Sequence, residues 1–182
     1  MEILPSLHKT KSGKQILIRE AVKSDANSLR NCILSYINGV TIPFTRDEFD
    51  KSDTEIEHWI EELNCNKNSL LLIAEINGEI IGNIDVTSSK RSMLKHTGYI
   101  GMGIHEDWQN KGIGSLLFQK MIECYERNNE MELLWLQVFG TNTAGLHMYR
   151  KFGFEESGRQ EKFIKRNDGN YIDNVIMTKK LT

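Results

Sequence analysis

Apolar residues alternate with polar ones, or form short continuous runs, in seven stretches of the chain, and both patterns predict β-strands. We expect the strands at residues 15–20, 69–76, 79–87, 97–104, 133–139, 155–166 and 171–180. Asn77-Gly78, between the second and third strands, is typical of a tight hairpin turn, and the polar segment 167–170 predicts a second hairpin.

Four further segments repeat apolar residues every three or four positions, which predicts amphipathic helices. We expect the helices at residues 26–36, 54–63, 115–127 and 142–151. Ser24-Asp25 offers an N-cap for the first helix, and Thr54 with Glu57 has the spacing of a capping box at the second.

The order of the elements predicts how the sheet is connected. The strand 97–104 precedes the helix 115–127, and the apolar run 133–139 follows it. Such a crossover is right-handed and joins two parallel strands, while the hairpins add antiparallel ones. The sequence therefore predicts an α/β fold: a mixed sheet with helices on both faces, in which the run 133–139 is buried on both sides.

Composition narrows the class of protein. The 182 residues suit one domain, which we place at residues 15–182, with 1–14 as a loose or edge-lying extension. The net charge of −2 gives no electrostatic footprint for nucleic acid or an anionic membrane. The three cysteines are far apart and odd in number, which favours reduced thiols in the cytoplasm over a disulfide framework or a metal site.

A glycine-containing turn joins the strand 97–104 to the next helix. It consists of Gln109, Asn110, Lys111, Gly112, Ile113 and Gly114. A strand–turn–helix junction directs free backbone N–H groups and the positive end of a helix at one point, where a phosphate can bind. Glycines let the ligand approach the backbone closely. The turn therefore predicts a phosphate or pyrophosphate site.

A second motif lies at the helix 142–151 and the turn after it. Asn142 stands at the helix start, where its amide can cap the helix or hold a ligand carbonyl. Tyr149 follows seven residues later, two helical turns on, so both side chains point to one side. A buried tyrosine bonded to backbone would explain Tyr149 equally well.

Together these motifs resemble the GNAT superfamily of acyl-CoA N-acyltransferases. The resemblance rests on Gln109, Gly112 and Gly114 after a strand, followed by Asn142, Ala144, Tyr149 and Gly153-Phe154. It implies a mostly antiparallel sheet of six to seven strands that splays at the two parallel middle strands, with about four helices. It also implies an acetyl-CoA-dependent N-acetyltransferase without a metal, and a homodimer.

The resemblance also assigns roles to residues. The pyrophosphate of acetyl-CoA is expected on the turn 109–114. The pantetheine arm is expected along the backbone of Met102, Gly103 and Ile104, which is also the candidate oxyanion donor. Asn142 matches an asparagine near the pantetheine. Tyr149 matches the tyrosine that protonates the departing thiolate.

The general base stays open at this point. Relatives that acetylate protein N-termini carry a glutamate where this chain has Gln137, and an amide does not accept a proton near neutral pH. The other candidates are Glu75, Asp85, His96, His105 and a chain of water molecules leading to solvent.

The acceptor pocket is expected from residues 36–60, the loop 88–96 and the hairpin tip 166–171. Its predicted wall is aromatic and acidic, which suits a cationic amine. The wall residues are Tyr36, Phe44, Phe49, Trp59, Asp47, Glu48 and Asp50. The favoured acceptor is a primary amine of a small molecule or amino-acid-like compound.

Three other functions are considered. The acceptor can be a protein or peptide amine. The chain can be a non-catalytic module that binds acyl-CoA, although the presence of Tyr149 favours turnover. Finally, the glycine turn can be the phosphate loop of a nucleotide-binding α/β protein, but the chain lacks the Gly-x-x-x-x-Gly-Lys-Ser/Thr pattern and a Rossmann motif.

Overall fold

The computed structural model describes residues 3–10, 13–37, 41–43, 45–126 and 130–181. In chain order its strands and helices are β1 (Ser6–Lys9), β2 (Gln15–Glu20), α1 (Ala26–Tyr36), α2 (Asp53–Cys65), β3 (Leu70–Ile76), β4 (Glu79–Ser88), β5 (Thr97–Ile104), α3 (Ile113–Tyr125), β6 (Leu133–Phe139), α4 (Thr143–Lys151), β7 (Glu155–Lys165) and β8 (Tyr171–Lys180). Within these ranges no helix is long and apolar enough to cross a membrane.

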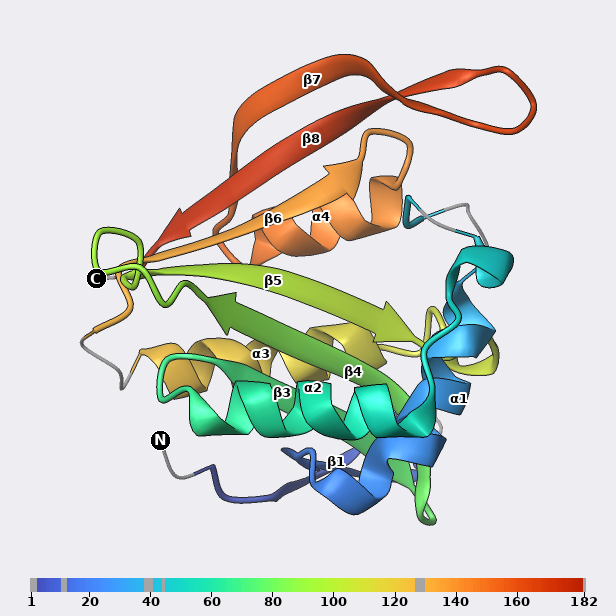
Figure 1. The fold of residues 1–182 in the computed structure, drawn as a ribbon, viewed down its shortest axis with the longest axis vertical. Helices are drawn as coiled ribbons and strands as arrows, with labels where there is room; N and C mark the ends of the chain where they lie inside the picture. The colour runs from blue at the N-terminus through green and yellow to red at the C-terminus, as the bar shows by residue number, and fades with distance from the viewer. Residues whose placement is uncertain (1–2, 11–12, 38–40, 44, 127–129, 182) are drawn as a thin grey trace.

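The strands form a single sheet in the order β1-β2-β3-β4-β5-β6-β8-β7 (Figure 1). Only β5 and β6 are parallel neighbours, so the predicted mixed, mostly antiparallel sheet is confirmed. The sheet has eight strands, one more than the six to seven expected. The additional strand is β1, from within the predicted extension, which pairs with β2 at the edge of the sheet.

Helices cover both faces of the sheet, as predicted. In Figure 1, α2 lies in front of β3 and α3 lies behind it. Leu71 and Ile73 belong to the hydrophobic cluster that includes α1 and α2, whereas Leu70 and Leu72 belong to the cluster that includes α3. A strand covered on both faces must be apolar throughout, which explains the continuous apolar run in β3.

The N-cap of α2 lies two residues before the predicted one, and the helix begins at Asp53. Ser52 is the N-cap, and its hydroxyl accepts from the backbone N–H of Glu55 at 3.3 Å. The Glu55 carboxylate accepts in return from the N–H of Ser52 at 2.7 Å. The Ser52/Glu55 and Thr54/Glu57 pairs have the same spacing, so the prediction of a cap at Thr54 chose the wrong one of two overlapping patterns.

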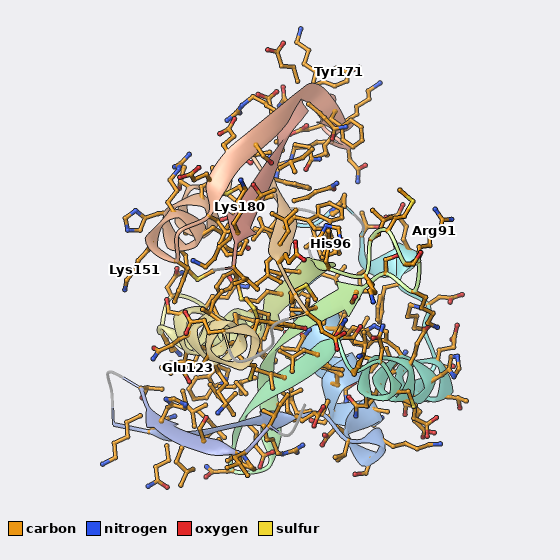
Figure 2. The ribbon with its side chains drawn as sticks, turned by 90° about the vertical axis from the view of Figure 1, so that its left-hand side faces the viewer. Arg91, His96, Glu123, Lys151, Tyr171 and Lys180 are labelled. Atoms are coloured by element: carbon orange, nitrogen blue, oxygen red, sulfur yellow. The ribbon has the colours of Figure 1, made fainter. Side chains whose placement is uncertain are left out.

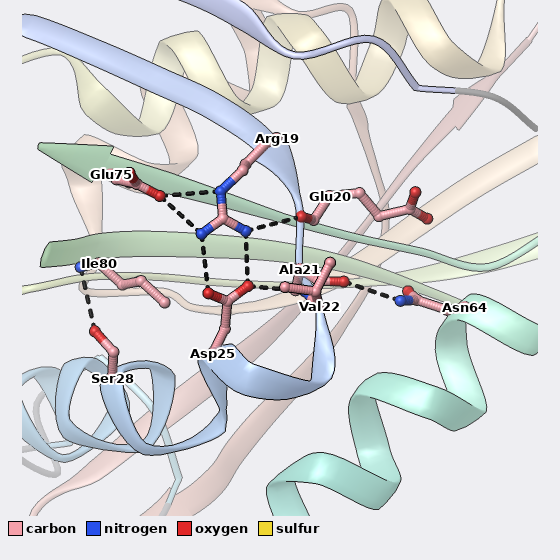
Figure 3. A network of polar contacts seen from close by, with 9 residues as sticks. All are labelled: Arg19, Glu20, Ala21, Val22, Asp25, Ser28, Asn64, Glu75 and Ile80. Atoms are coloured by element: carbon pink, nitrogen blue, oxygen red, sulfur yellow. Dashed lines mark hydrogen bonds and ion pairs between the residues drawn. The ribbon is translucent and has the colours of Figure 1, made fainter. Parts of the chain in front are cut away.

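The Asp25 side chain does not cap α1, although the helix begins where it was expected. Its carboxylate accepts two hydrogen bonds from Arg19, at 2.7 and 2.9 Å (Figure 3). Arg19 also contacts Glu75 on β3 at 2.8 Å. This part-buried network joins β2, β3 and the start of α1, which fixes the helix on the face of the sheet where the site is found.

The two parallel strands separate along their length. Only three residue pairs are in register: Thr97 with Leu133, Gly98 with Leu134 and Tyr99 with Trp135. Beyond them β5 and β6 diverge (Figure 1). The splay that the resemblance implied is therefore confirmed, and it opens the sheet in the middle of the molecule.

The burial of β6 corrects the expectation that the run 133–139 is buried on both sides. Leu134, Leu136 and Val138 are buried, but Gln137 on the opposite face is exposed. The run is thus buried on one face along its length, whereas on the other face Leu133 and Trp135 are half-buried, Gln137 is exposed and Phe139 is buried.

Candidate active site

A cavity of about 940 Å³ occupies the gap between β5 and β6. Its lining comes from the diverging strands, the turn before α3, the inner side of α4, and α1 and α2 with the segment between them. Pockets that hold small molecules have similar volumes. The gap in the sheet therefore provides one continuous space that reaches from the glycine turn to the α1–α2 side.

The glycine turn forms one wall of this cavity. Asn110 and Gly112 have positive φ angles of 59° and 84°, and Gly112 is the N-cap of α3. A Cβ atom at Gly112 would meet nothing within 4 Å, so glycine is needed there for its backbone angle rather than for space. The first N–H to bond within this helix is that of Leu116, to Gly112, so the preceding N–H groups are available to an anion.

Two residues of the turn have other roles. The side chain of Ile113 is buried in the core and leaves only its backbone for a ligand. Lys111 donates to the backbone oxygen of Asp107, and its ammonium lies 4.8 Å from the centre of the Trp108 ring. The turn residues that line the cavity are Gln109, Asn110, Gly112 and Gly114.

The end of β5 forms the next part of the lining. Met102, Gly103 and Ile104 all border the cavity, where β5 has lost its partner strand. Backbone groups of a strand point alternately to its two neighbours, so those directed toward β6 face the cavity. The backbone segment on which the resemblance places an extended ligand therefore borders the cavity, and its role as a ligand site stays a prediction.

Asn142 and Tyr149 border the same cavity from α4. Asn142 is the N-cap, and its Oδ1 accepts from the N–H of Gly145 at 2.9 Å. Because the cap uses Oδ1, the amide nitrogen is the group that can reach a ligand carbonyl.

The Tyr149 ring packs against Phe118 and Phe154, with centroids 5.4 and 6.5 Å away. Burial raises the pKa of Tyr149 to about 12, with a smaller contribution from Tyr99. The phenol is therefore protonated at neutral pH and can donate a proton.

Asp85 on β4 is a carboxylate at the edge of this cavity. It lies opposite Gly101 on β5. Burial raises the pKa of Asp85 to about 7, against a weaker opposing effect of its own backbone hydrogen bond. A carboxyl group with such a pKa is half ionised near neutral pH and can act as a general base.

Tyr36 lies beside Asp85 on the same face of the sheet. Its ring covers Gly103, and its hydroxyl donates to Asn83 Oδ1 at 3.1 Å. Burial raises the pKa of Tyr36 well above its usual value, and the nearby Cys32 and Asp85 add to the effect. Strand periodicity places Asn83 and Asp85 on one face, a signal that sequence reasoning did not use.

Comparison with known proteins identifies the family. Residues 35–154 match the model of the Acetyltransferase (GNAT) family. The chain belongs to the GNAT acetyltransferase family. The expectations of a GNAT fold and of an acyltransferase are thereby confirmed.

Two individual GNAT relatives align with nearly the whole of this chain. The L-amino acid N-acetyltransferase AaaT of Escherichia coli is 27% identical over 168 residues, which cover 91% of this chain and 98% of that protein. A crystallised GNAT-family acetyltransferase from Streptococcus pneumoniae is 30% identical, with a TM-score of 0.84 over 91% of this chain and 99% of that one.

A more distant GNAT structure is that of a phosphinothricin acetyltransferase from Sinorhizobium meliloti in complex with acetyl-CoA. It is 20% identical, with a TM-score of 0.79 over 90% of this chain and 87% of that one. At this identity the likeness concerns the fold alone.

The structure distinguishes the four side-chain candidates for the general base in this GNAT chain by whether they line the cavity. Asp85 lines the cavity. Glu75 is paired with Arg19, 2.8 Å away (Figure 3). His105 accepts from the N–H of Asp107 through its Nδ1, and His96 lies at the opposite end of β5 (Figure 2). None of these three borders the cavity. Gln137 does border it, but an amide does not accept a proton near neutral pH.

The cavity is lined by aromatic residues of the predicted acceptor wall but not by its acidic residues. Tyr36, Phe49 and Trp59 line the cavity, while Phe44 lies outside the described residues. Asp47, Glu48 and Asp50 do not line it. Glu48, for example, accepts from the N–H of Thr45 at 2.6 Å.

Two predicted loops also lie away from the cavity. Neither the loop 88–96 nor the hairpin tip 166–171 contributes to its lining. Figure 2 shows Tyr171 at the far end of the β7–β8 hairpin. The body of that hairpin contributes instead, through Phe163, Ile164 and Asn174.

Proposed function

We propose that the protein transfers the acetyl group of acetyl-CoA to a primary amine of a small, amino-acid-like molecule, by direct attack in a ternary complex. The observation that carries this proposal is that Asp85 and Tyr149 border one cavity, which also contains the glycine turn. The similarity over nearly full length to an L-amino acid N-acetyltransferase supports the acceptor class.

The residues present fit acetyl-CoA. The turn 109–114 offers free N–H groups at a helix start for the pyrophosphate. The backbone of Met102, Gly103 and Ile104 offers a strand edge for the pantetheine arm and a donor for the oxyanion. Asn142 offers amide donors along the same path.

Asp85 and Tyr149 have complementary roles in this mechanism. Asp85 takes a proton from the ammonium group, so that the neutral nitrogen can attack the thioester carbon and form the C–N bond. As the C–S bond breaks, Tyr149 donates its phenolic proton to the sulfur. The nitrogen loses two protons overall: one reaches solvent through Asp85, and the other restores Tyr149.

Tyr99 interacts electrostatically with both Asp85 and Tyr149. The charge of Asp85 adds to the burial that raises the pKa of Tyr99, and Tyr99 in turn contributes to the raised pKa of Tyr149. The Tyr99 ring packs tilted against Trp135, with centroids 4.6 Å apart, at the point where β5 and β6 separate. Tyr99 is therefore a neighbour of both proposed groups at this point of the gap.

A panel of amines with acetyl-CoA tests the proposal. We expect release of free CoA thiol, formation of the N-acetyl product by mass spectrometry, and intersecting initial-rate lines when both substrates are varied. Parallel lines would contradict direct attack. Binding of CoA without turnover of any amine would contradict the enzymatic role, and turnover of peptides alone would contradict the small-molecule acceptor.

A further inference from the structure

Few charged side chains line the cavity. On the acceptor side they are one cation and one carboxylate. Among the described residues, the cavity is lined by the ionisable side chains Lys51, Asp85, His147 and Lys151, besides three tyrosines. His147 and Lys151 belong to α4, on the side assigned to acetyl-CoA. Lys51 and Asp85 are therefore the cation and the carboxylate of the acceptor side.

Lys51 is held at the mouth of this side by its backbone. Its carbonyl oxygen accepts from Arg30 Nε at 2.6 Å, which fixes the segment before α2 on α1. Its side chain is exposed and borders the cavity. The neighbouring Glu55 carboxylate is already bonded to Ser52, at 2.7 Å from the backbone nitrogen and 2.9 Å from the hydroxyl. The Lys51 charge also contributes to the lowered pKa of Glu55, after the hydrogen bonds from Ser52, but the exposed Lys51 side chain borders the cavity and can also meet an anionic group of a ligand.

Apart from these two groups, the acceptor side of the cavity is lined mainly by apolar side chains. Side chains from α1, α2 and the segment between them make up this wall. They are Ile33, Ile42, Pro43, Phe49, Ile56 and Trp59. The acidic residues of that segment do not border the cavity. An acceptor with several positive charges would find one carboxylate here and would place its other charges against apolar surface, which is unfavourable.

We infer that the acceptor is a free α-amino acid with a large apolar side chain, bound as a zwitterion with its ammonium group at Asp85 and its carboxylate at Lys51. The inference rests on the proposed function and specifies its substrate. The side chain packs on Phe49, Ile56 and Trp59. An amino acid meets all three features at once: a positive group, a negative group and an apolar body.

The expected selectivity follows from these contacts. Burial of a large apolar side chain favours phenylalanine or leucine over alanine by about 10- to 200-fold in kcat/KM. The contact with Lys51 is exposed, so it contributes less, up to about fivefold. Most of the discrimination between acceptors should therefore come from the apolar wall.

The test compares L-phenylalanine, its amide, the dipeptide Phe-Ala, L-alanine and L-aspartate as acceptors for the wild-type protein. We expect phenylalanine to have the highest kcat/KM, with the amide and the dipeptide about two- to fivefold lower because they lack the carboxylate next to the amine. Lys51→Ala should raise KM for phenylalanine more than it lowers kcat, and should remove the advantage over the amide. Lys51→Arg should restore it.

Lys90→Ala is the matched control, because Lys90 is an exposed lysine outside the cavity that pairs with Glu62 at 2.8 Å. It should keep the wild-type order of acceptors. Equal or better use of the amide or the dipeptide, or a preference for aspartate or alanine, would overturn the inference and leave acetyl transfer in place. Failure to acetylate any amine would overturn the proposed function as well.

Discussion

The carboxylate of Asp85 lies directly over Gly101, its partner on the neighbouring strand. A Cβ atom at position 101 would come within 2.6 Å of Asp85 Oδ1 and 3.1 Å of the carboxyl carbon. The absence of a side chain at residue 101 therefore creates the space in which the proposed base faces the cavity.

Gly101→Ala should displace the Asp85 carboxylate while the fold remains. The clash is with the end of a side chain, which can rotate away. We expect kcat/KM to fall about 10- to 100-fold, because small misplacements of a catalytic group are costly. Steady-state kinetics and thermal unfolding measure the two effects. Gly158→Ala is the control, since its Cβ would meet only Ile176 at 3.8 Å, and unchanged kinetics of Gly101→Ala would contradict the role of this space.

Tyr149→Phe should lower kcat about 10²- to 10⁴-fold, because the departing thiolate loses its proton donor. The phenyl ring keeps its contacts with Phe118 and Phe154, so the melting temperature should change little. Tyr171→Phe removes a hydroxyl from an exposed tyrosine and should have no effect on kcat. A Tyr149→Phe enzyme with wild-type kcat would show that another group protonates the sulfur.

Asn142 combines a structural and a ligand-binding role that two substitutions can separate. Asn142→Ala should remove the N-cap of α4, at a cost of about 1 kcal/mol, and weaken acetyl-CoA binding. Asn142→Ser keeps an oxygen that can accept from Gly145 but lacks the amide donors. It should retain stability and still bind acetyl-CoA more weakly, as calorimetry can measure. Normal binding by the serine variant would reduce Asn142 to a cap.

The raised pKa of Asp85 has a consequence for stability. Because the folded pKa is about 7 and the ordinary value is 3.8, the folded protein holds this proton more tightly than the unfolded chain. The associated stability is complete below about pH 4 and is lost as the pH rises through 7. Asp85→Asn should therefore stabilise the protein at pH 8, by up to about 4 kcal/mol, and less at pH 5.

Urea unfolding at both pH values measures this difference. Asp50→Asn changes an exposed carboxylate outside the cavity and should follow the wild type at both. An Asp85→Asn variant that gains nothing at pH 8 would contradict the burial of a charged carboxylate at this position.

Much of the fold could be predicted from local patterns. The strands β2, β5, β6 and β8 have the predicted bounds, because strong apolar patterns define them. β1 was missed because it has four residues and Leu7 is largely exposed, so its pattern carries little signal. The domain bounds, the cytoplasmic location and the homodimer stay predictions.

The motifs expected on the donor side could be recognised locally, whereas the lining of the acceptor side could not. The turn 109–114 and Tyr149 are local motifs with fixed spacing, and Gln109, Asn110, Gly112, Gly114 and Tyr149 border the cavity, while their roles stay predictions. Which way Asp47 or Asp85 faces depends on how α1 and α2 pack on the sheet, which no local pattern encodes. Asp85 could be proposed as the base only from the structure, in which it lines the cavity while Glu75 pairs with Arg19.

The most direct test of the account is the pH dependence of kcat/KM for the wild type and for Asp85→Asn. Since kcat/KM reports groups of the free enzyme and free substrate, the wild-type value should rise with pH through a pKa of about 7, as Asp85 ionises. In Asp85→Asn this rise should be absent and the rate about 10²- to 10⁴-fold lower, leaving only the titration of the amine itself. The same rise near pH 7 in both proteins would contradict Asp85 as the general base.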